Sequence, residues 1–282
     1  MNLSRLFYFA VCKVWGFENA KQIETVHLSY CKYILGVKKS TQNDFIYGIL
    51  GRFPLYIIRQ IRIIKYWLKI VTGRKSLYVS NIYQNSISCN NFERKPSWAR
   101  SVKRLLYSSG FGEVWLAQGV ADESLFVQLF QNRLHDMYKQ DWHSRLENSN
   151  RARFYRSLDL TFSHSLFLKS IECKPHRQAL TKLIVSSHHL NIESGRWKRP
   201  KTPSNMRFCS ACAGKIEDEY HLLLECSLYN DIRSRLIPKY YWTRPSMFKA
   251  VNLINCKQKK VIQNVAKFVF LAFKRRTELQ TN

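Results

Sequence analysis

The stretch PLYIIRQIRIIKYWLKIVTG, residues Pro54–Gly73, shows the helical pattern of this chain most clearly. Its apolar residues recur at helical spacing, Pro54 suits a first turn, and Gly73 suits an end. At about 100° per residue the basic side chains fall on one narrow stripe, and apolar side chains occupy most of the remaining surface. The stripe consists of Arg59, Arg62, Lys65 and Lys69. The stretch therefore predicts a helix buried on its wide side, whose basic stripe is either a solvated face or a track for phosphates.

Helical periodicity recurs on both sides of this stretch, and the sequence contains no internal repeat. The other segments with helical spacing are 23–37, 97–110, 122–149, 151–160, 176–190 and 246–276. Residues 80–96 carry several Asn and Ser without periodicity and predict a linker or a surface loop. The predicted fold class is mainly α, with helical bundle-like segments followed by a small metal-binding module and terminal helices.

The charge of the chain indicates a polyanionic partner. There are 46 Lys and Arg against 19 Asp and Glu, a net charge of +27, and the sequence pI is about 10.0. Such an excess repels itself in a compact fold and attracts anions. Hydrophobic residues make up 45% of the chain, which excludes a disordered chain. Nucleic acid is the favoured partner, and an anionic membrane surface is the alternative. No apolar run is long enough to span a bilayer.

The eight cysteines are scattered apart from one cluster, which argues against a disulfide framework and predicts a reducing compartment, the nucleus or the cytoplasm. The cluster, CSACAGKIEDEYHLLLEC, has the spacing C-x2-C-x8-H-x4-C. Zinc takes four thiolate or imidazole ligands from short loops of this kind. The expected ligands are Cys209, Cys212, His221 and Cys226. Because four protein ligands leave no open position, we expect a structural Zn²⁺; the alternative is a reduced C-x-x-C without metal.

A basic arm, GRWKRPKTPSNMRF (Gly195–Phe208), precedes this finger, which is itself acidic. The basic residues of the arm are Arg196, Lys198, Arg199, Lys201 and Arg207. Trp197 and Phe208 lie among these cations, where they can stack on unpaired bases. We therefore expect the zinc to fix the approach of an arm that binds RNA or single-stranded DNA. An ordinary solvated loop is the alternative.

Four stretches resemble the C-terminal region of non-LTR retrotransposon reverse transcriptases. VWGFENAKQIETVHLSYCKYILGVKKST with YGILGRFPL resembles the thumb and post-thumb segment, and SSHHLNIESGRWKRP resembles the lead-in to the terminal finger. CSACAGKIEDEYHLLLEC resembles that finger, and YYWTRPSM with NVAKFVFLAF resembles the tail after it. The resemblance implies five segments. They are a thumb/post-thumb-like segment 1–79, the linker or loop 80–96, a helical domain 97–195, the arm and CCHC module 196–240, and terminal helices 241–282.

The polymerase activity of that family is not implied for this chain. The family holds its catalytic metals with an adjacent Asp pair, and no two aspartates are adjacent here. Nothing before Val14 is expected to hold fingers and palm. The expected function is thus a non-catalytic, nucleic-acid-binding C-terminal fragment. Two alternatives remain open: a part of a reverse transcriptase that is active only with a separately encoded palm, and a peripheral membrane or protein-interaction module built on the 54–71 helix.

Overall fold

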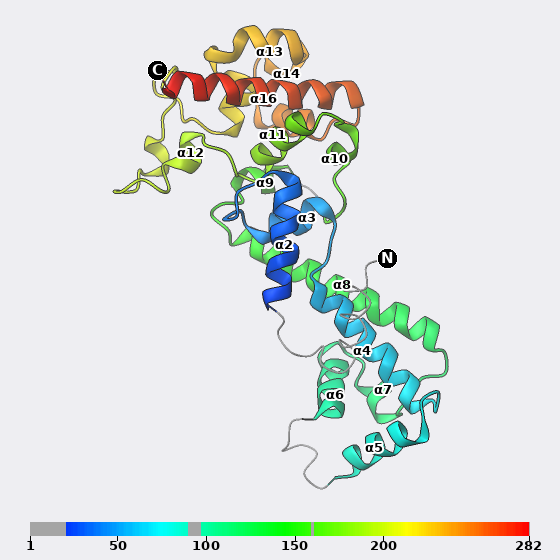
Figure 1. The fold of residues 1–282 in the computed structure, drawn as a ribbon. Coiled ribbons are helices and arrows are strands. Elements are labelled where there is room, and N and C mark those ends of the chain that lie inside the picture. The colour runs from blue at the N-terminus through cyan, green and yellow to red at the C-terminus, as the bar shows by residue number, and fades with distance from the viewer. Residues whose placement is uncertain (1–20, 90–96, 159–160, 282) are drawn as a thin grey trace. The chain divides into compact units, whose positions relative to one another are not determined.

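The computed structural model describes residues 21–89, 97–158 and 161–281 (Figure 1). Across these ranges the secondary structure is α-helical and forms no β-strand; an isolated antiparallel bridge joins Phe208 to Ile216. The predicted mainly α fold class is confirmed, together with a small Cys/His module near its predicted place.

The chain divides into two compact units, a division that differs from the five segments expected from the sequence. Unit 1 contains the described residues up to Thr25 and those of Phe53–Trp142, and unit 2 contains those of Val26–Arg52 and from His143 onward. The helices of unit 1 are α4 (Leu55–Val71), α5 (Leu77–Ser88), α6 (Trp98–Ser108), α7 (Gly112–Leu116) and most of α8 (Glu123–Glu147).

Helix α4 supplies much of the core of unit 1. It begins directly after Pro54, and Gly73 beyond its end takes a left-handed φ of 68°, as the sequence predicts. Trp67 is fully buried, its indole Nε1 donates to the hydroxyl of Tyr83 (2.8 Å), and that hydroxyl donates to Gln118 (2.7 Å). The apolar side of α4 is thus used within the protein, which does not favour a membrane module built on this helix. Its buried apolar residues are Ile57, Ile61, Ile63, Ile64, Trp67, Leu68 and Ile70.

Residues 80–88 correct the expectation of a linker or loop, because they belong to helix α5. The only buried side chain of α5 is Tyr83, which lies against Trp67 and at 6.5 Å from the ring of Trp98. A helix held by one aromatic side chain shows no apolar periodicity, so its sequence resembles a loop. Residues 90–96 lie outside the described residues.

Unit 2 is built around the long terminal helix α16, which packs on α11 and against α10, α13 and α15 (Figure 1). Buried apolar residues of α11, such as Leu180 and Leu183, and of α16, such as Phe268 and Val269, form this core. The elements of unit 2 are α2 (Lys21–Leu35, from Val26), α3 (Asn43–Leu50), the end of α8, α9 (Arg153–Ser157), α10 (Leu166–Ser170), α11 (Lys174–Ile184), α12 (Asn191–Ser194), η1 (Ser204–Met206), η2 (His221–Glu225), η3 (Ser227–Tyr229), α13 (Asn230–Leu236), α14 (Lys239–Trp242), α15 (Met247–Ile254) and α16 (Lys259–Thr281).

Most predicted helices appear close to their expected bounds. Gly36, with a φ of 67°, ends α2, and the side chain of Asp122 accepts from the backbone N–H of Leu125 (2.9 Å) at the start of α8. Among the described helices, none combines the length and the apolar character that a bilayer span requires.

Candidate functional site

The first two cysteines of the finger lie on one tight turn. The backbone N–H of Cys209 donates to the carbonyl of Lys215 (2.7 Å), and the N–H of Lys215 donates to the carbonyl of Cys212 (3.4 Å). Gly214 closes the turn with a φ of 66°, a conformation that favours glycine. The C-x2-C spacing therefore folds as a knuckle that presents both thiols to one side.

The other two candidate ligands are brought together by the single π-turn η2, residues His221–Glu225. The backbone N–H of Cys226 donates to the carbonyl of His221 (2.8 Å), an i to i+5 bond that sets the two side chains at the two ends of one wide turn. The carboxylate of Asp218 accepts from the N–H of His221 (2.8 Å) and caps the start of the turn.

The four side chains converge on one point. The Sγ atom of Cys226 lies 3.8 Å from the Sγ atoms of both Cys209 and Cys212, and all four ligand atoms, including that of His221, lie within 4.8 Å of one another. Two sulfur atoms bound tetrahedrally to zinc at about 2.3 Å lie about 3.8 Å apart, whereas disulfide sulfurs would be about 2.05 Å apart. The cluster can therefore bind a metal ion, at the residues that the sequence predicts.

The ring of His221 is oriented as a metal ligand requires. Its Nδ1 lies 3.3 Å from a carboxylate oxygen of Glu225, while its Nε2 is buried and has no hydrogen-bond partner. A buried polar atom without a partner is costly and calls for an explanation. Metal-bound imidazoles commonly donate their other N–H to a carboxylate. A metal ion bound at the thiol cluster could supply the missing partner of Nε2, and Glu225 would then fix the tautomer.

The three thiols differ in how readily they ionise. Burial raises the pKa of Cys209 and of Cys226. Burial also opposes ionisation of Cys212, but hydrogen bonds with Ser227 and Cys226 outweigh it and lower the pKa of this thiol to about 6. One thiolate is therefore available at neutral pH, and a metal that binds all three sulfurs displaces the remaining protons.

A buried cation that the sequence analysis missed, Arg233 of α13, lies against the cluster. Its side chain donates to the carbonyls of Leu223 (2.9 Å) and Cys226 (2.8 Å), and its guanidinium lies 5.7 Å from the ring of Phe268. Burial lowers the pKa of Arg233, and the nearby charge of Cys226 raises it. A divalent metal ion bound by three thiolates and one neutral imidazole would leave the site near −1, which the charge of Arg233 would match. Nothing in the local sequence distinguishes this arginine from its exposed neighbours.

Three acidic residues of the finger bind the body of unit 2 rather than facing solvent. Glu217 accepts two hydrogen bonds from Arg276 of α16 (2.6 and 2.7 Å), Asp218 pairs with Arg153 (2.9 Å), and Glu219 with His188 (2.9 Å). All three carboxylates are buried. The acidic charge that the sequence shows in the finger therefore attaches the finger to the rest of unit 2.

The basic arm before the finger has an exposed part. The indole of Trp197 is 64% exposed, and Phe208 is also exposed. The side chains of Lys198, Arg199 and Lys201 are exposed beside Trp197 in sequence. These five side chains are therefore at the surface, and their contact with a nucleic acid stays a prediction.

The other two arginines of the arm make internal contacts. Arg196 pairs with Glu193 (2.9 Å) and donates to the carbonyl of Asn150 (2.9 Å). Arg207 is buried and donates to the carbonyls of Thr202 (2.8 and 2.9 Å) and Ile192. The prediction that Arg196 and Arg207 contact nucleic acid is therefore corrected, because their guanidinium groups attach the arm to the protein.

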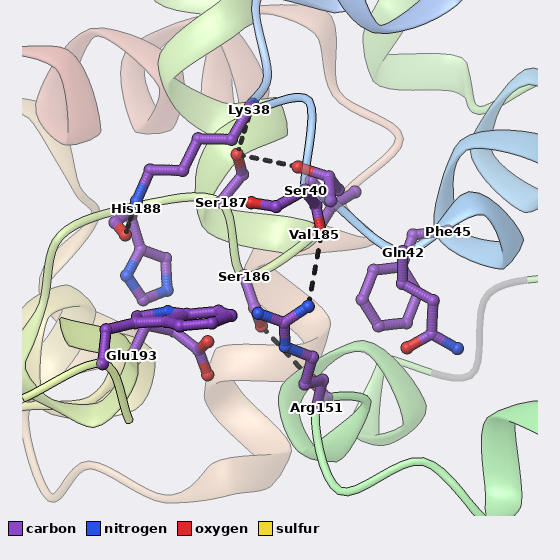
Figure 2. A pocket seen from close by; sticks show the side chains of 12 residues that line it. Lys38, Ser40, Gln42, Phe45, Arg151, Val185, Ser186, Ser187, His188 and Glu193 are labelled. Carbon is purple, nitrogen blue, oxygen red and sulfur yellow. Dashed lines mark hydrogen bonds between the residues drawn. The ribbon is translucent and has the colours of Figure 1, made fainter. Parts of the chain in front are cut away.

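A small cavity of about 20 Å³ lies beside the arm (Figure 2). Arg151 lines it, donates to the carbonyl of Ser40 (3.2 Å), and holds its guanidinium 4.9 Å from the ring of Trp197. Lys38 lines the opposite part, with its Nζ donating to the carbonyl of His188 (3.0 Å). The volume suffices for about one water molecule, so it is not a ligand site. The structural feature at this cavity is the guanidinium of Arg151, which is held against one face of Trp197.

The basic stripe of α4 is only partly at the surface. Lys65 and Lys69 are exposed, and Arg62 is half-buried. Arg59 is 7% exposed, so the prediction that it belongs to a surface stripe is wrong. Arg59 lies at the boundary between the basic stripe and the apolar side of α4, where a small rotation of the helix about its axis decides whether a side chain is exposed.

Comparisons of the chain with protein-family models, with curated proteins and with solved structures each found no match.

Proposed function

We propose that the cluster holds one structural zinc ion. The sulfur spacing of 3.8 Å and the unpartnered Nε2 of His221 support this choice. Four protein ligands fill a tetrahedral shell, so the metal stabilises the finger and has no open position for a substrate.

Elemental analysis of the purified chain tests this proposal, and one zinc per chain is the expected result. Cobalt(II) in its place should give the absorption of a tetrahedral thiolate site. Cys226→Ser should abolish stoichiometric zinc, whereas the matched control Cys173→Ser, an exposed free thiol, should retain it. Equal zinc in both variants would contradict the assignment.

The function that the site supports best is binding of RNA or single-stranded DNA through the arm. The observation that carries it is the exposed Trp197, flanked by exposed cations and with Arg151 against its ring. Stacking on an aromatic ring combined with phosphate contacts is the usual way that proteins bind single strands. Zinc acts indirectly, because the finger is joined to the start of α12, and α12 leads into the arm and accepts from Arg207.

The test is the salt dependence of binding to a labelled single-stranded RNA. Each phosphate contact contributes about 0.7 to the log–log slope for a single strand. Replacing Lys198, Arg199 and Lys201 together by Ala should therefore lower the slope by about 2. The matched control replaces three other exposed lysines of unit 2 by Ala, Lys239, Lys257 and Lys260. If both triple variants lower the slope equally, the attraction is diffuse and the arm is not the site.

The proposal includes an origin: a C-terminal fragment of a non-LTR retrotransposon reverse transcriptase, in the nucleus or the cytoplasm, without catalysis of its own. It rests on the four quoted stretches, and on the presence of the proposed ligands in the finger-like stretch. A palm-coding frame immediately upstream of the gene would support this origin, and an unrelated upstream frame would argue against it.

A second candidate function is association with a separately supplied reverse-transcriptase palm. Helix α2 favours it, because Val26, Tyr30 and Tyr33 on one of its faces are all more than half exposed. Large apolar side chains that recur at helical spacing on a surface suit a protein contact. The test adds a purified palm of this family to a primer–template assay, with and without the chain. Stimulation that Tyr33→Glu removes would support the association, and no stimulation would exclude it.

A further inference from the structure

A cavity of about 590 Å³ opens between the end of α2, the last turn of α11 and the last turns of α16, all within unit 2. Its lining includes no residue of the arm or of the thiol cluster, although Lys38, Ser187 and His188 also line the small cavity beside the arm. Its volume falls in the range of about 300–1,000 Å³ that is usual for small-molecule sites, and it is far larger than a lone inorganic anion needs. Its lining residues are Gly36, Val37, Lys38, Lys182, Ser187, His188, His189, Leu190, Phe273, Arg276 and Thr277.

The lining of this cavity is one-sided in charge. It contains Lys38, Lys182, His189 and Arg276, and no carboxylate. The charge of Arg276 is matched by Glu217, which it holds in a bidentate pair. Lys38 and Lys182 form no ion pair with any residue that the structure describes. The ammonium group of Lys38 donates one hydrogen bond to the carbonyl of His188. Neither ammonium group is therefore neutralised by a direct ion pair, although the charge of Glu193, which lies outside the cavity lining, acts on Lys38.

The surroundings of His189 report the same positive field. Burial lowers the pKa of this imidazole, and the charges of Lys38, Arg276, His188 and Lys182 lower it further. Three basic side chains and a neighbouring imidazole thus act on the ring of His189, which lines the cavity. The ammonium group of Lys is a common ligand of phosphate.

One wall of the cavity is apolar. Phe273 of α16 lines it together with Val37 and Leu190, and the ring of Phe273 lies 6.2 Å from that of His188. A ligand that uses the whole volume must therefore combine an anionic part with a flat or apolar part.

We propose that this cavity binds a nucleotide, with Lys38 and Lys182 binding its phosphate and Phe273 contacting its base. The ligand is either a free nucleotide or a phosphorylated residue of a strand, and both share the same phosphate chemistry. The site goes beyond the arm, since none of its residues is shared with Lys198, Arg199 or Lys201.

The first test is calorimetric titration of the zinc-loaded full chain with adenosine 5′-monophosphate, inorganic phosphate, adenosine and citrate. The monophosphate should bind about tenfold or more tightly than the other three, because only it offers both a phosphate and a base. Citrate that binds as tightly would overturn a nucleotide site in favour of a general anion site. Adenosine that binds as tightly would overturn the role of the phosphate.

The second test uses matched variants. Lys38→Gln with Lys182→Gln should weaken binding of the monophosphate by about tenfold or more. The control pair is Lys39→Gln with Lys174→Gln, which removes the same charge from two exposed lysines. Lys39 follows Lys38 in the chain, and Lys174 lies on the same helix as Lys182. This control should bind the monophosphate as the unchanged protein does. Phe273→Leu should weaken the monophosphate several-fold and leave inorganic phosphate unchanged. Far-UV circular dichroism checks that every variant is folded. Equal affinity in the two lysine pairs would overturn the proposal.

Two further measurements locate the ligand and its source. The NMR signals of the His189 ring, assigned by their loss in His189→Asn, should shift during the titration, and binding without any shift would overturn the location.

A short oligonucleotide with a 5′-phosphate is then compared with its 5′-hydroxyl form. A preference for the 5′-phosphate that the Lys38 and Lys182 changes remove identifies a strand end as the source. If the two oligonucleotide forms bind equally and the Lys38 and Lys182 changes weaken both, the ligand is an internal phosphate of the strand. If the two forms bind equally and those changes weaken neither, the ligand is the free nucleotide. The arm variants should lose affinity for a strand but bind the monophosphate as the unchanged protein does, so the two sites are tested separately.

Discussion

Arg276 of α16 and Glu217 of the finger form a buried bidentate ion pair, with Nε to Oε1 at 2.6 Å and Nη2 to Oε2 at 2.7 Å. Burial opposes the charge of Arg276, but the hydrogen bonds and charge of Glu217 raise its pKa. The second carboxylate oxygen also accepts from the backbone N–H of Asn191 (2.7 Å). One carboxylate thereby connects the finger, α12 and the terminal helix.

Replacing Arg276 by Met should lower the free energy of unfolding by about 3–5 kcal/mol, because Glu217 is left as a buried, uncompensated charge. Urea denaturation in zinc-saturated buffer measures the change. The neighbouring pair of Arg275 and Asp231 is the natural control, because Arg275 is only half-buried and Asp231 is exposed. Arg275→Met should have a much smaller effect. If Arg275→Met and Arg276→Met are equally destabilising, the buried pair does not attach the finger.

The sequence predicts the helices whose burial follows a simple period. Helices α2, α4, α6 and α8 each present a regular apolar face, and all four lie within a few residues of their predicted bounds. Helix α5 was missed because Tyr83 alone anchors it. The ligand set was also predictable, since C-x2-C and H-x4-C spacings each fit one turn, although the π form of the second turn was not.

The arm and the charges around the finger were harder to predict, because tertiary contacts decide which ions are exposed. Arg196, Arg207 and Lys198 are equivalent as letters in one basic stretch, yet two of them bind internal acceptors and one is exposed. Glu217, Asp218 and Glu219 resemble a solvated acidic face, but each has a basic partner more than 30 residues away in the chain. The cavity beside Phe273 joins three distant segments, which no local pattern connects.

The carboxylate of Glu225 should determine how tightly the metal is held. It accepts from Nδ1 of His221, so Glu225→Gln weakens the basicity and the orientation of the ring. Loss of such a partner typically lowers metal affinity about 10- to 100-fold. Competition with a chelator of known affinity measures this, with Glu172→Gln, an exposed acid outside the finger, as the control. Unchanged affinity in Glu225→Gln would mean that His221 is not a ligand through Nε2.

The purified chain should not incorporate nucleotides on a primer–template with magnesium or manganese. Template-directed synthesis needs carboxylates that hold two metals over the attacking and leaving oxygens, and the sequence has no adjacent aspartates to form that pair. The measurement is extension of a labelled primer on an RNA template, with a reverse transcriptase as the positive control. Extension above the blank without enzyme would show catalysis in this chain.

Trp197→Ala should weaken binding to single-stranded RNA by about 1–3 kcal/mol, the usual contribution of one stacked base. Arg151 lies against one face of the indole, at 4.9 Å from the ring, so a single face remains for the base. The salt slope should stay nearly unchanged, because stacking releases no counterions. Duplex RNA should bind the variant as it binds the unchanged chain, since its bases are already stacked on one another. Fluorescence anisotropy with strands of matched length measures all three quantities.

Tyr240 provides the control for this prediction, because it is as exposed as Trp197 and also carries a cation over its ring, the Nζ of Lys249 at 4.6 Å. An exposed aromatic ring with a neighbouring cation is therefore not unique to the arm, and exposure alone does not identify a binding site. Tyr240→Ala should leave the affinity for single-stranded RNA unchanged, whereas Trp197→Phe should keep most of it by retaining an aromatic face. Equal losses in Trp197→Ala and Tyr240→Ala would mean that bases stack wherever a ring is exposed, and the arm would then have no special role in binding.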